Sequence, residues 1–370
     1  MPHDPYKALY LHVPFCVKRC GYCDFATAAM PRDDARIDAY IEDLCLQIRR
    51  KAKEGELACV ESVYIGGGTP SHVGMGRLSM LLYTLSTSMR LEPDVECTME
   101  ANPESLDGRM VRDIWALGVN RLSLGVQSFD DAVLRTLGRA HDADGARRAV
   151  ACARERFENV SVDLMCGIPG QSAKSFRASV EEAAALGAAH VSVYPLTIED
   201  GTPFASAVAR GALPEPDDDV EAEHMQIAAE VLGAAGFSRY EVASYARPGF
   251  SCRHNSAYWT GVPYLGLGRA AATMTQNGQR RMRVQDGQVT DDLDVRQMAA
   301  EDLMLGMRMS AGVSEELVAR ATALIPRTPE VLADLEARGL AVWEGGRFCP
   351  TERGWLCGNE LYGALLDLAP

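Results

Sequence analysis

Three cysteines lie close together near the start of the chain. Cys16, Cys20 and Cys23 are separated by three and then two residues. Thiolates bind soft metals, and three of them on one loop can hold three irons of a 4Fe–4S cluster while the fourth iron keeps an open coordination site. Zinc is the alternative, but zinc sites usually take four ligands from two separated pairs, and the chain has no second Cys-x-x-Cys. The spacing therefore favours an iron–sulfur cluster with one open iron.

The residues around these cysteines carry a specific signature. Tyr22 precedes the last cysteine, and a Tyr-x-His-x-Pro-Phe run that begins at Tyr10 precedes the first. This stretch resembles radical S-adenosylmethionine (SAM) proteins, and among them the relatives of the oxygen-independent coproporphyrinogen III oxidase. In that superfamily SAM chelates the open iron through its amino and carboxylate groups, and an electron from the reduced cluster cleaves SAM to a 5′-deoxyadenosyl radical. The resemblance implies a cluster on the three cysteines and a SAM site that includes Tyr10 and Tyr22.

Strand-like and helix-like segments alternate along the first half of the chain. Strands are expected at residues 8–13, 60–65, 95–100, 122–126, 160–165 and 191–194. Alternation with helices implies a parallel sheet with right-handed crossovers. The pattern alone does not separate a barrel from a flat doubly wound sheet. The resemblance implies the barrel: an α/β fold that forms a partial (β/α)6 radical SAM barrel.

Glycines and polar residues follow several of these strands. Ligands of parallel α/β proteins gather at the carboxyl ends of the strands. A glycine run after the second strand is typical of a turn, but missing side chains also let a backbone approach a ligand. The resemblance implies that this run and the other polar residues contact SAM: Gly66, Gly67, Gly68, Thr69, Glu100, Gln127, Arg139 and Asp163.

A second group of reactive residues lies far along the chain. His254, Tyr258 and Trp259 follow Cys252 within a short stretch, and together they could line a flat apolar ligand with an iron on His254 or, in reserve, on Cys252. A turn whose aromatic rings only pack is the alternative. The His-Asn-x-x-Tyr-Trp order resembles the sequence associated with haem binding in the HemW-type haem chaperones. The resemblance therefore implies haem as a third cofactor, with His254 as the iron ligand.

The chain is long enough for more than one domain. We expect the barrel over residues 1–205, a connecting region that carries the histidine motif over 206–295, and a smaller domain over 296–370. The last part has helices followed by a hairpin and a helix, the order of a winged-helix-like domain. From Glu301 to Asp367 it holds eleven Asp or Glu against six Arg and no Lys, so we expect no binding of nucleic acid.

Composition bounds the remaining expectations. Apolar residues make up 47% of the 370 residues and the formal net charge is −14, which fits an ordinary globular protein and argues against a nucleic-acid partner. The start of the chain lacks the pattern of a secretory signal, and no apolar run has the length of a membrane span. We therefore expect a cytoplasmic location. Five cysteines outside the loop are expected to pack as small hydrophobic residues: Cys45, Cys59, Cys97, Cys152 and Cys349.

Two classes of function remain open from the sequence. One is a haem chaperone that passes haem to an acceptor protein, with an electron donor that the sequence does not name. The other is a radical SAM enzyme that acts on a porphyrin, either the coproporphyrinogen III dehydrogenase or a haem-opening methyltransferase. Phe25 stands where the dehydrogenase has a fourth cysteine, and the dehydrogenase's N-terminal extension is missing, so the chaperone is favoured. One departure from the family is Arg269-Ala270, where relatives usually have Pro-Gly; Arg269 could remodel the pocket or meet a haem propionate.

Overall fold

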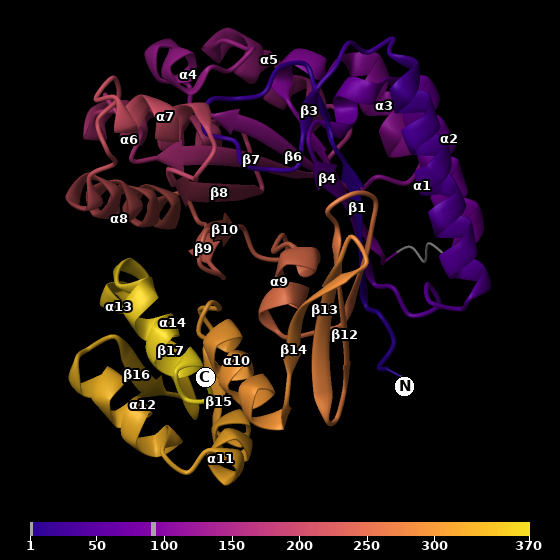
Figure 1. Cartoon of the computed structure of the whole chain (residues 1–370). Helices are drawn as coiled ribbons and strands as arrows, with labels where there is room; N and C mark the ends of the chain where they lie inside the picture. The colour runs from indigo at the N-terminus through magenta and orange to yellow at the C-terminus, as the bar shows by residue number, and fades with distance from the viewer. Residues whose placement is uncertain (1–2, 90–93) are drawn as a thin grey trace.

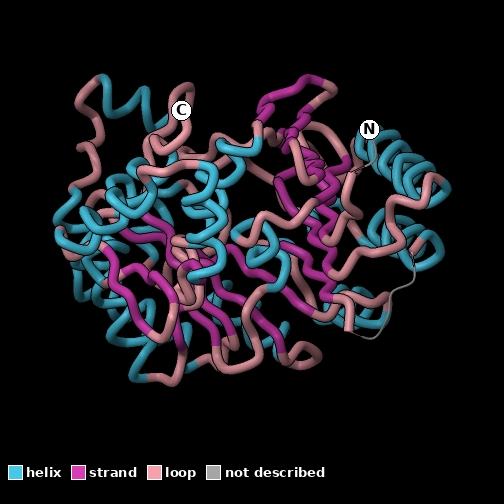
Figure 2. The backbone as a smooth tube through the Cα atoms, turned by 90° about the horizontal axis from the view of Figure 1, so that it is seen from below, coloured by secondary structure: helices cyan, strands magenta, loops and turns pink. Residues whose placement is uncertain are grey.

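Six parallel strands form the centre of the molecule. In the computed structural model, which describes residues 3–89 and 94–370, each of these strands pairs with the next in chain order, as the sequence predicts. Helices lie along the outer side of the strands (Figures 1 and 2). The strands are β1 (Ala8–Val13), β4 (Ser62–Gly67), β5 (Glu96–Ala101), β6 (Arg121–Gln127), β7 (Asn159–Cys166) and β8 (His190–Pro195).

The helices of this half begin at polar caps and bury one apolar face. Helix α1 (Ala35–Lys53) begins after Asp34, whose carboxylate accepts a hydrogen bond from the backbone of Arg36. It then buries Ile37 and Ile41, one helical turn apart, against the sheet. The other elements are η1 (Pro70–Val73), α2 (Met75–Ser88), η2 (Pro103–Ser105), α3 (Gly108–Ala116), α4 (Asp131–Leu137), α5 (Ala143–Arg154), α6 (Ala173–Ala185), α7 (Pro203–Ala209) and α8 (Asp218–Ala234).

Later parts of the chain extend the same sheet at both edges. Strand β11 (Tyr264–Leu267) pairs in parallel with β1, and an antiparallel ladder of β12 (Ala272–Asn277), β13 (Arg280–Gln285) and β14 (Gln288–Leu293) follows it. At the opposite edge β10 (Ser244–Ala246) pairs with β8, and β9 (Ser238–Arg239) pairs with β10. Residues 206–295 are thus hydrogen-bonded into the sheet of residues 1–205. A turn separates β9 from β10.

The C-terminal part has its own hydrophobic core, which includes Leu303, Leu335 and Phe348. The predicted order of helices and hairpin is found, because three helices precede the hairpin of β16 and β17; β15, between the first and second of these helices, completes a sheet in the order β15-β17-β16. A backbone bridge between Glu241 and Met309 joins this part to the barrel. Its elements are α10 (Val295–Gly306), β15 (Val313–Ser314), α11 (Glu315–Leu324), α12 (Thr328–Ala337), β16 (Ala341–Glu344), β17 (Arg347–Pro350), α13 (Glu352–Leu356) and α14 (Gly358–Leu366). Among the described helices, none has the length and apolar character needed to cross a membrane.

Candidate functional site

A cavity of about 400 Å³ lies at the carboxyl ends of the parallel strands. Its wall brings together residues from the cysteine loop and from five of the six strands or the loops that follow them. Most of the residues expected at a cluster and SAM site line it: Cys16, Cys20, Tyr22, Cys23, Gly67, Gly68, Thr69, Glu100, Gln127, Arg139 and Asp163. Tyr10 and Gly66 are not among the lining residues. Tyr10 instead stacks on the ring of Tyr64, which does line the cavity.

The cysteine loop is fixed to the barrel at several points. Strand β2 (Phe15–Cys16) pairs with β3 (Ala28–Ala29), and the backbone of Gly21 accepts a hydrogen bond from Phe204 at 2.9 Å. Among the residues that the structure describes, no three His, Cys, Asp or Glu side chains are close enough to bind one metal ion. A 4Fe–4S cluster is larger than one ion and takes each thiolate on a different iron. Three half-buried thiols around one cavity therefore fit a cluster better than a mononuclear site.

The glycine run after β4 packs against the chain that leads into the cysteine loop. Gly68 donates its N–H to the carbonyl of Val13 at 2.9 Å, and a Cβ at Gly68 would lie 2.7 Å from the backbone nitrogen of Phe15. Gly67 has a φ of 108°, and a side chain there would collide with the ring of His12. These glycines are thus required for close backbone packing beneath the cysteines. Their predicted contact with SAM remains a prediction.

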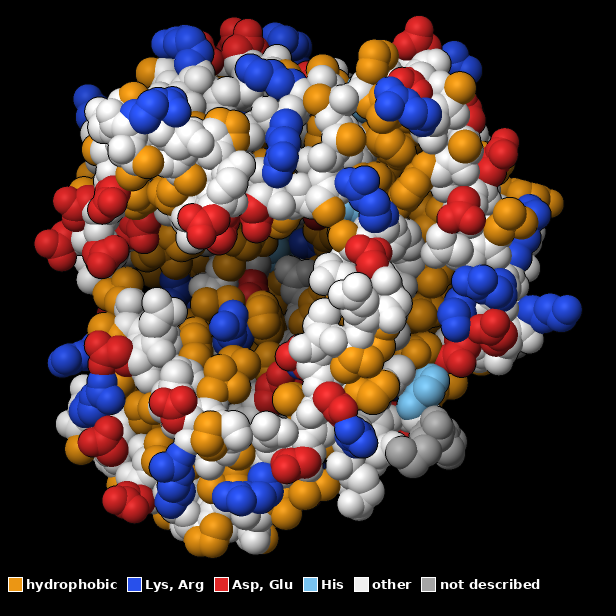
Figure 3. All heavy atoms as spheres, viewed as in Figure 1, with side chains coloured by type: hydrophobic (Ala, Val, Ile, Leu, Met, Phe, Trp, Pro, Cys, Tyr) orange, Lys and Arg blue, Asp and Glu red, His pale blue; other side chains and the backbone are white. Residues whose placement is uncertain are grey.

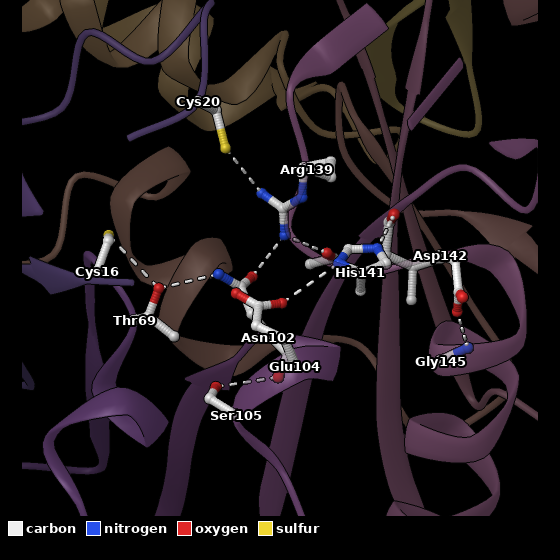
Figure 4. A network of polar contacts seen from close by, with 12 residues as sticks. Cys16, Cys20, Thr69, Asn102, Glu104, Ser105, Arg139, His141, Asp142 and Gly145 are labelled. Atoms are coloured by element: carbon white, nitrogen blue, oxygen red, sulfur yellow. Dashed lines mark hydrogen bonds and ion pairs between the residues drawn. The ribbon is translucent and has the colours of Figure 1, made fainter. Parts of the chain in front are cut away.

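Arg139 is half-buried beside the cysteine loop (Figure 4). Its Nη1 donates to Cys20 Sγ at 3.3 Å and to the Tyr22 hydroxyl at 3.4 Å, and its Nη2 donates to the carbonyl of Gly125 at 2.7 Å. Its Nε has no hydrogen-bond partner among the described residues. A buried donor without a partner is costly, so a ligand carboxylate that reached this N–H would relieve that cost. That feature fits SAM.

Two carboxylates also line the cavity. Glu100 accepts hydrogen bonds from the Tyr64 hydroxyl at 2.9 Å and from the N–H of Gly67 at 3.0 Å, and burial raises its pKa to about 7. Asp163 accepts from the Ser123 hydroxyl at 3.1 Å, and burial raises its pKa as well. Both can accept hydrogen bonds from hydroxyl or amino groups of a bound ligand.

The histidine motif lies on the short helix α9 (Arg253–Trp259), at the opposite end of the strands. The His254 side chain is buried, with Nδ1 at 3.1 Å from the hydroxyl of Ser62 and Nε2 at 3.1 Å from the hydroxyl of Tyr258. Ser62 is the first residue of β4, so the ring lies at the amino ends of the strands. Burial lowers the pKa of His254 to about 3, which keeps its imidazole neutral.

Glu96, the first residue of β5, caps helix α9. Its carboxylate accepts hydrogen bonds from the backbone N–H groups of Arg253 and His254, both at 3.0 Å, and from the Cys252 thiol at 3.4 Å. Cys252 is completely buried. The Trp259 indole donates to Glu241 at 3.0 Å. The motif residues thus form a polar floor under the barrel and do not line the cavity.

Several residues of both regions were missed from the sequence. Asn102, Tyr64 and Ser123 line the cavity, and Glu96 and Arg121 lie in the floor. Strand periodicity gives a signal for some of them. Side chains two residues apart share a face, so Glu96 and Glu100 on β5 point to the same side.

The Arg269-Ala270 departure lies against the cysteine loop. Arg269 is exposed and donates from Nη2 to the carbonyl of Ala26 at 3.4 Å. Ala270 has a φ of 60°, a conformation that glycine adopts at lower cost. A glycine, which the family resemblance leads us to expect at this position, would suit this backbone conformation.

Comparisons with known proteins agree with this architecture. The model of the radical SAM superfamily matches residues 10–183, and the HemN C-terminal domain matches residues 293–357. A protein of Mycobacterium tuberculosis named heme chaperone HemW is 37% identical over 99% of this chain and 96% of its own length. A heme chaperone HemW of Bacillus subtilis is 33% identical over 97% of this chain and 99% of its own length. The solved structure of coproporphyrinogen III oxidase (HemN) from Escherichia coli superposes with a TM-score of 0.79 at 22% identity, over 98% of this chain and 90% of that one, which supports the fold.

Proposed function

This chain belongs to the HemW family of the radical SAM superfamily, and from that premise we propose that it is a haem chaperone, which binds haem and passes it to an acceptor protein. The observation that carries the proposal is the likeness over nearly the full length of both chains to proteins named heme chaperone HemW. The histidine motif on α9 is consistent with it, since neutral imidazole is a good ligand for haem iron.

The cavity at the carboxyl ends is the proposed site of a 4Fe–4S cluster and SAM. Cys16, Cys20 and Cys23 would hold the cluster, which supplies the electron for reductive cleavage of SAM in this superfamily. The unpaired Nε of Arg139 is the donor that suits the SAM carboxylate, and Glu100 is an acceptor for the hydroxyl or amino groups of SAM. The other residues proposed for this pocket are Tyr10, Tyr22, Gly66, Gly67, Gly68, Thr69, Gln127 and Asp163.

Haem would bind at α9, with His254 on the iron and the rings of Tyr258 and Trp259 against the porphyrin. In the structure both nitrogens of His254 are within hydrogen-bond distance of other side chains, and the ring is 1% exposed. Iron ligation therefore requires the ring to leave the floor. Helix α9 has seven residues and lies between the barrel and the C-terminal domain, beside a hollow whose wall carries many hydrophobic side chains (Figures 1 and 3). A flat apolar ligand can approach α9 from this hollow.

A radical SAM enzyme that acts on a porphyrin is the second candidate. It is favoured by the cavity, which brings the cysteines together with Glu100 and Arg139. Phe25 argues against the coproporphyrinogen III dehydrogenase, because it occupies the position of a fourth cysteine and its side chain is exposed at the cavity.

Anaerobic reconstitution followed by haem titration separates the two candidates. We expect stoichiometric haem binding and no conversion of coproporphyrinogen III in the presence of SAM and a reductant. His254→Ala should weaken haem binding or shift the Soret band while the cluster absorbance stays unchanged. The matched control is Tyr258→Phe, which keeps the ring and removes only the hydroxyl next to His254; its effect and that of Cys252→Ser should be smaller. Formation of protoporphyrinogen IX would contradict the proposal.

A further inference from the structure

A continuous chain of hydrogen bonds joins two of the three cluster cysteines (Figure 4). Arg139 Nη1 donates to Cys20 Sγ, and its Nη2 donates to Asn102 Oδ1 at 2.7 Å. The Nδ2 of Asn102 donates to Thr69 Oγ1 at 2.9 Å, and the Thr69 hydroxyl donates to Cys16 Sγ at 3.4 Å. The Asn102 carboxamide therefore hydrogen-bonds both to the guanidinium that donates to Cys20 and to the hydroxyl that donates to Cys16.

The direction of this chain is fixed by its ends. The guanidinium has only donors, so the Asn102 oxygen must face Arg139 and its NH₂ group must face Thr69. With the Thr69 oxygen accepting from Asn102, its own proton is directed to Cys16 Sγ. Hydrogen bonds in such a series polarise one another, and this series begins at a cation, the Arg139 guanidinium.

The backbone around Asn102 places its side chain between the two donors. Asn102 follows β5, and its carbonyl accepts hydrogen bonds from the N–H and the hydroxyl of Ser105, both at 3.0 Å. On the neighbouring strand β6, a Cβ at Gly125 would lie 2.7 Å from Asn102 Oδ1. The missing side chain of Gly125 thus makes room for the carboxamide.

Hydrogen bonds to cysteine sulfurs are one of the factors that set the reduction potential of an iron–sulfur cluster. A donor to a ligating thiolate stabilises negative charge on the cluster, and the reduced cluster carries one more negative charge than the oxidised one. Each such bond therefore raises the reduction potential. Two of the three sulfurs receive donors from this one chain.

We propose that Asn102 is a positioning residue that raises the reduction potential of the cluster by orienting the Thr69 hydroxyl onto Cys16 and the Arg139 guanidinium onto Cys20. The inference rests on the proposed cluster site and is independent of haem binding. It assigns to Asn102, and to the glycine at 125 that accommodates it, a role in cluster reduction.

The test is a redox titration of the reconstituted cluster in the full-length protein, followed by electron paramagnetic resonance of the reduced state. Asn102→Leu removes both amide contacts at nearly constant volume, and Thr69→Val removes the hydroxyl donor alone. Both midpoint potentials should become more negative, with the larger shift in Asn102→Leu, and Thr69→Ser should restore the wild-type value. Thr98→Val is the matched control, because the buried Thr98 hydroxyl on β5 has no hydrogen-bond partner among the described residues; its potential should equal that of the wild type.

Wild-type potentials in fully iron-loaded Asn102→Leu and Thr69→Val would overturn the inference, as would an equal shift in Thr98→Val. Should Asn102→Leu fail to load iron, the comparison of Thr69→Val with Thr69→Ser decides. Failure of the cluster site itself is distinguishable, because the triple variant Cys16→Ser, Cys20→Ser, Cys23→Ser would then retain wild-type iron.

Discussion

Strand β5 places a carboxylate at each end of the barrel, and the two carboxylates have different surroundings. Glu100, near the carboxyl end, faces the cavity that the cysteines also line. Glu96, at the amino end, is 5% exposed and has its oxygens occupied by the backbone and thiol at the start of α9. The same residue type on the same face of one strand is thus open to a ligand at one end and part of a closed floor at the other. Whether a polar residue at the end of a strand can meet a ligand therefore depends on which elements cover that end of the sheet.

The polar groups that surround His254 in the floor are paired, but buried atoms without a partner occur in both regions. In the floor His254 contacts Ser62 and Tyr258. Among the described residues, the Nε of Arg139 in the cavity wall and the Nε of Arg121 in the floor both lack a hydrogen-bond partner. Unpaired atoms therefore do not separate the two ends. The cavity has open volume beside its polar groups, whereas His254 is 1% exposed, so a ligand can enter the cavity in the described conformation and reaches His254 only after α9 moves.

The largest effect on stability is expected from removing the Glu96 carboxylate, which caps α9 in the floor. Glu96→Ala leaves two backbone N–H groups and the Cys252 thiol without their acceptor in a buried place, so the free energy of unfolding should fall by about 3–5 kcal/mol. Urea unfolding of the apo protein measures it. The control is Glu61→Ala, which removes an exposed carboxylate paired with Lys7 and should cost less than about 1 kcal/mol. Equal costs for the two variants would show that the floor is not specially stabilised by Glu96.

A smaller effect is expected from the cavity carboxylate, and it depends on pH. The pKa of Glu100 is about 7 in the folded protein against 4.5 when unperturbed, so the folded state binds more protons between these values. The stability of the apo protein should therefore fall as the pH rises from about 4.5 to about 7, by roughly 1–3 kcal/mol from this group. Glu100→Gln should remove this part of the pH dependence. If unfolding midpoints of the two proteins run parallel over that range, Glu100 does not carry the raised pKa.

Local patterns predicted one of these two ends much better than the other. The cysteine spacing and the residues after each strand are local in sequence, and the parallel sheet necessarily brings them to one edge. The burial of His254 depends on Ser62, which is 192 residues away, and on the capping of α9 by Glu96. Composition of the motif carries no information on either partner. The β12–β14 ladder was also not predicted, because its exposed polar strands lack a continuous apolar face.

The role of Asn102 also lay outside local patterns. Asn102 stands two positions after Glu100, which the family resemblance implies for the SAM site. Its hydrogen bonds toward Cys16 and Cys20 form only when β4, β5 and the loop after α4 lie side by side. The space for its side chain depends on the glycine at 125. Such bridging residues are defined by tertiary structure.

The most direct test of the account is hydrogen exchange of the α9 backbone with and without haem. Glu96 holds the N–H groups of Arg253 and His254 in the closed floor, so their exchange should be slow in the haem-free protein. Release of His254 to an iron should break these contacts, and exchange in α9 should then become faster on haem loading while helix α5 stays unchanged. Haem bound at full occupancy with α9 as protected as before would show that haem binds without opening the floor, and that His254 is a structural residue.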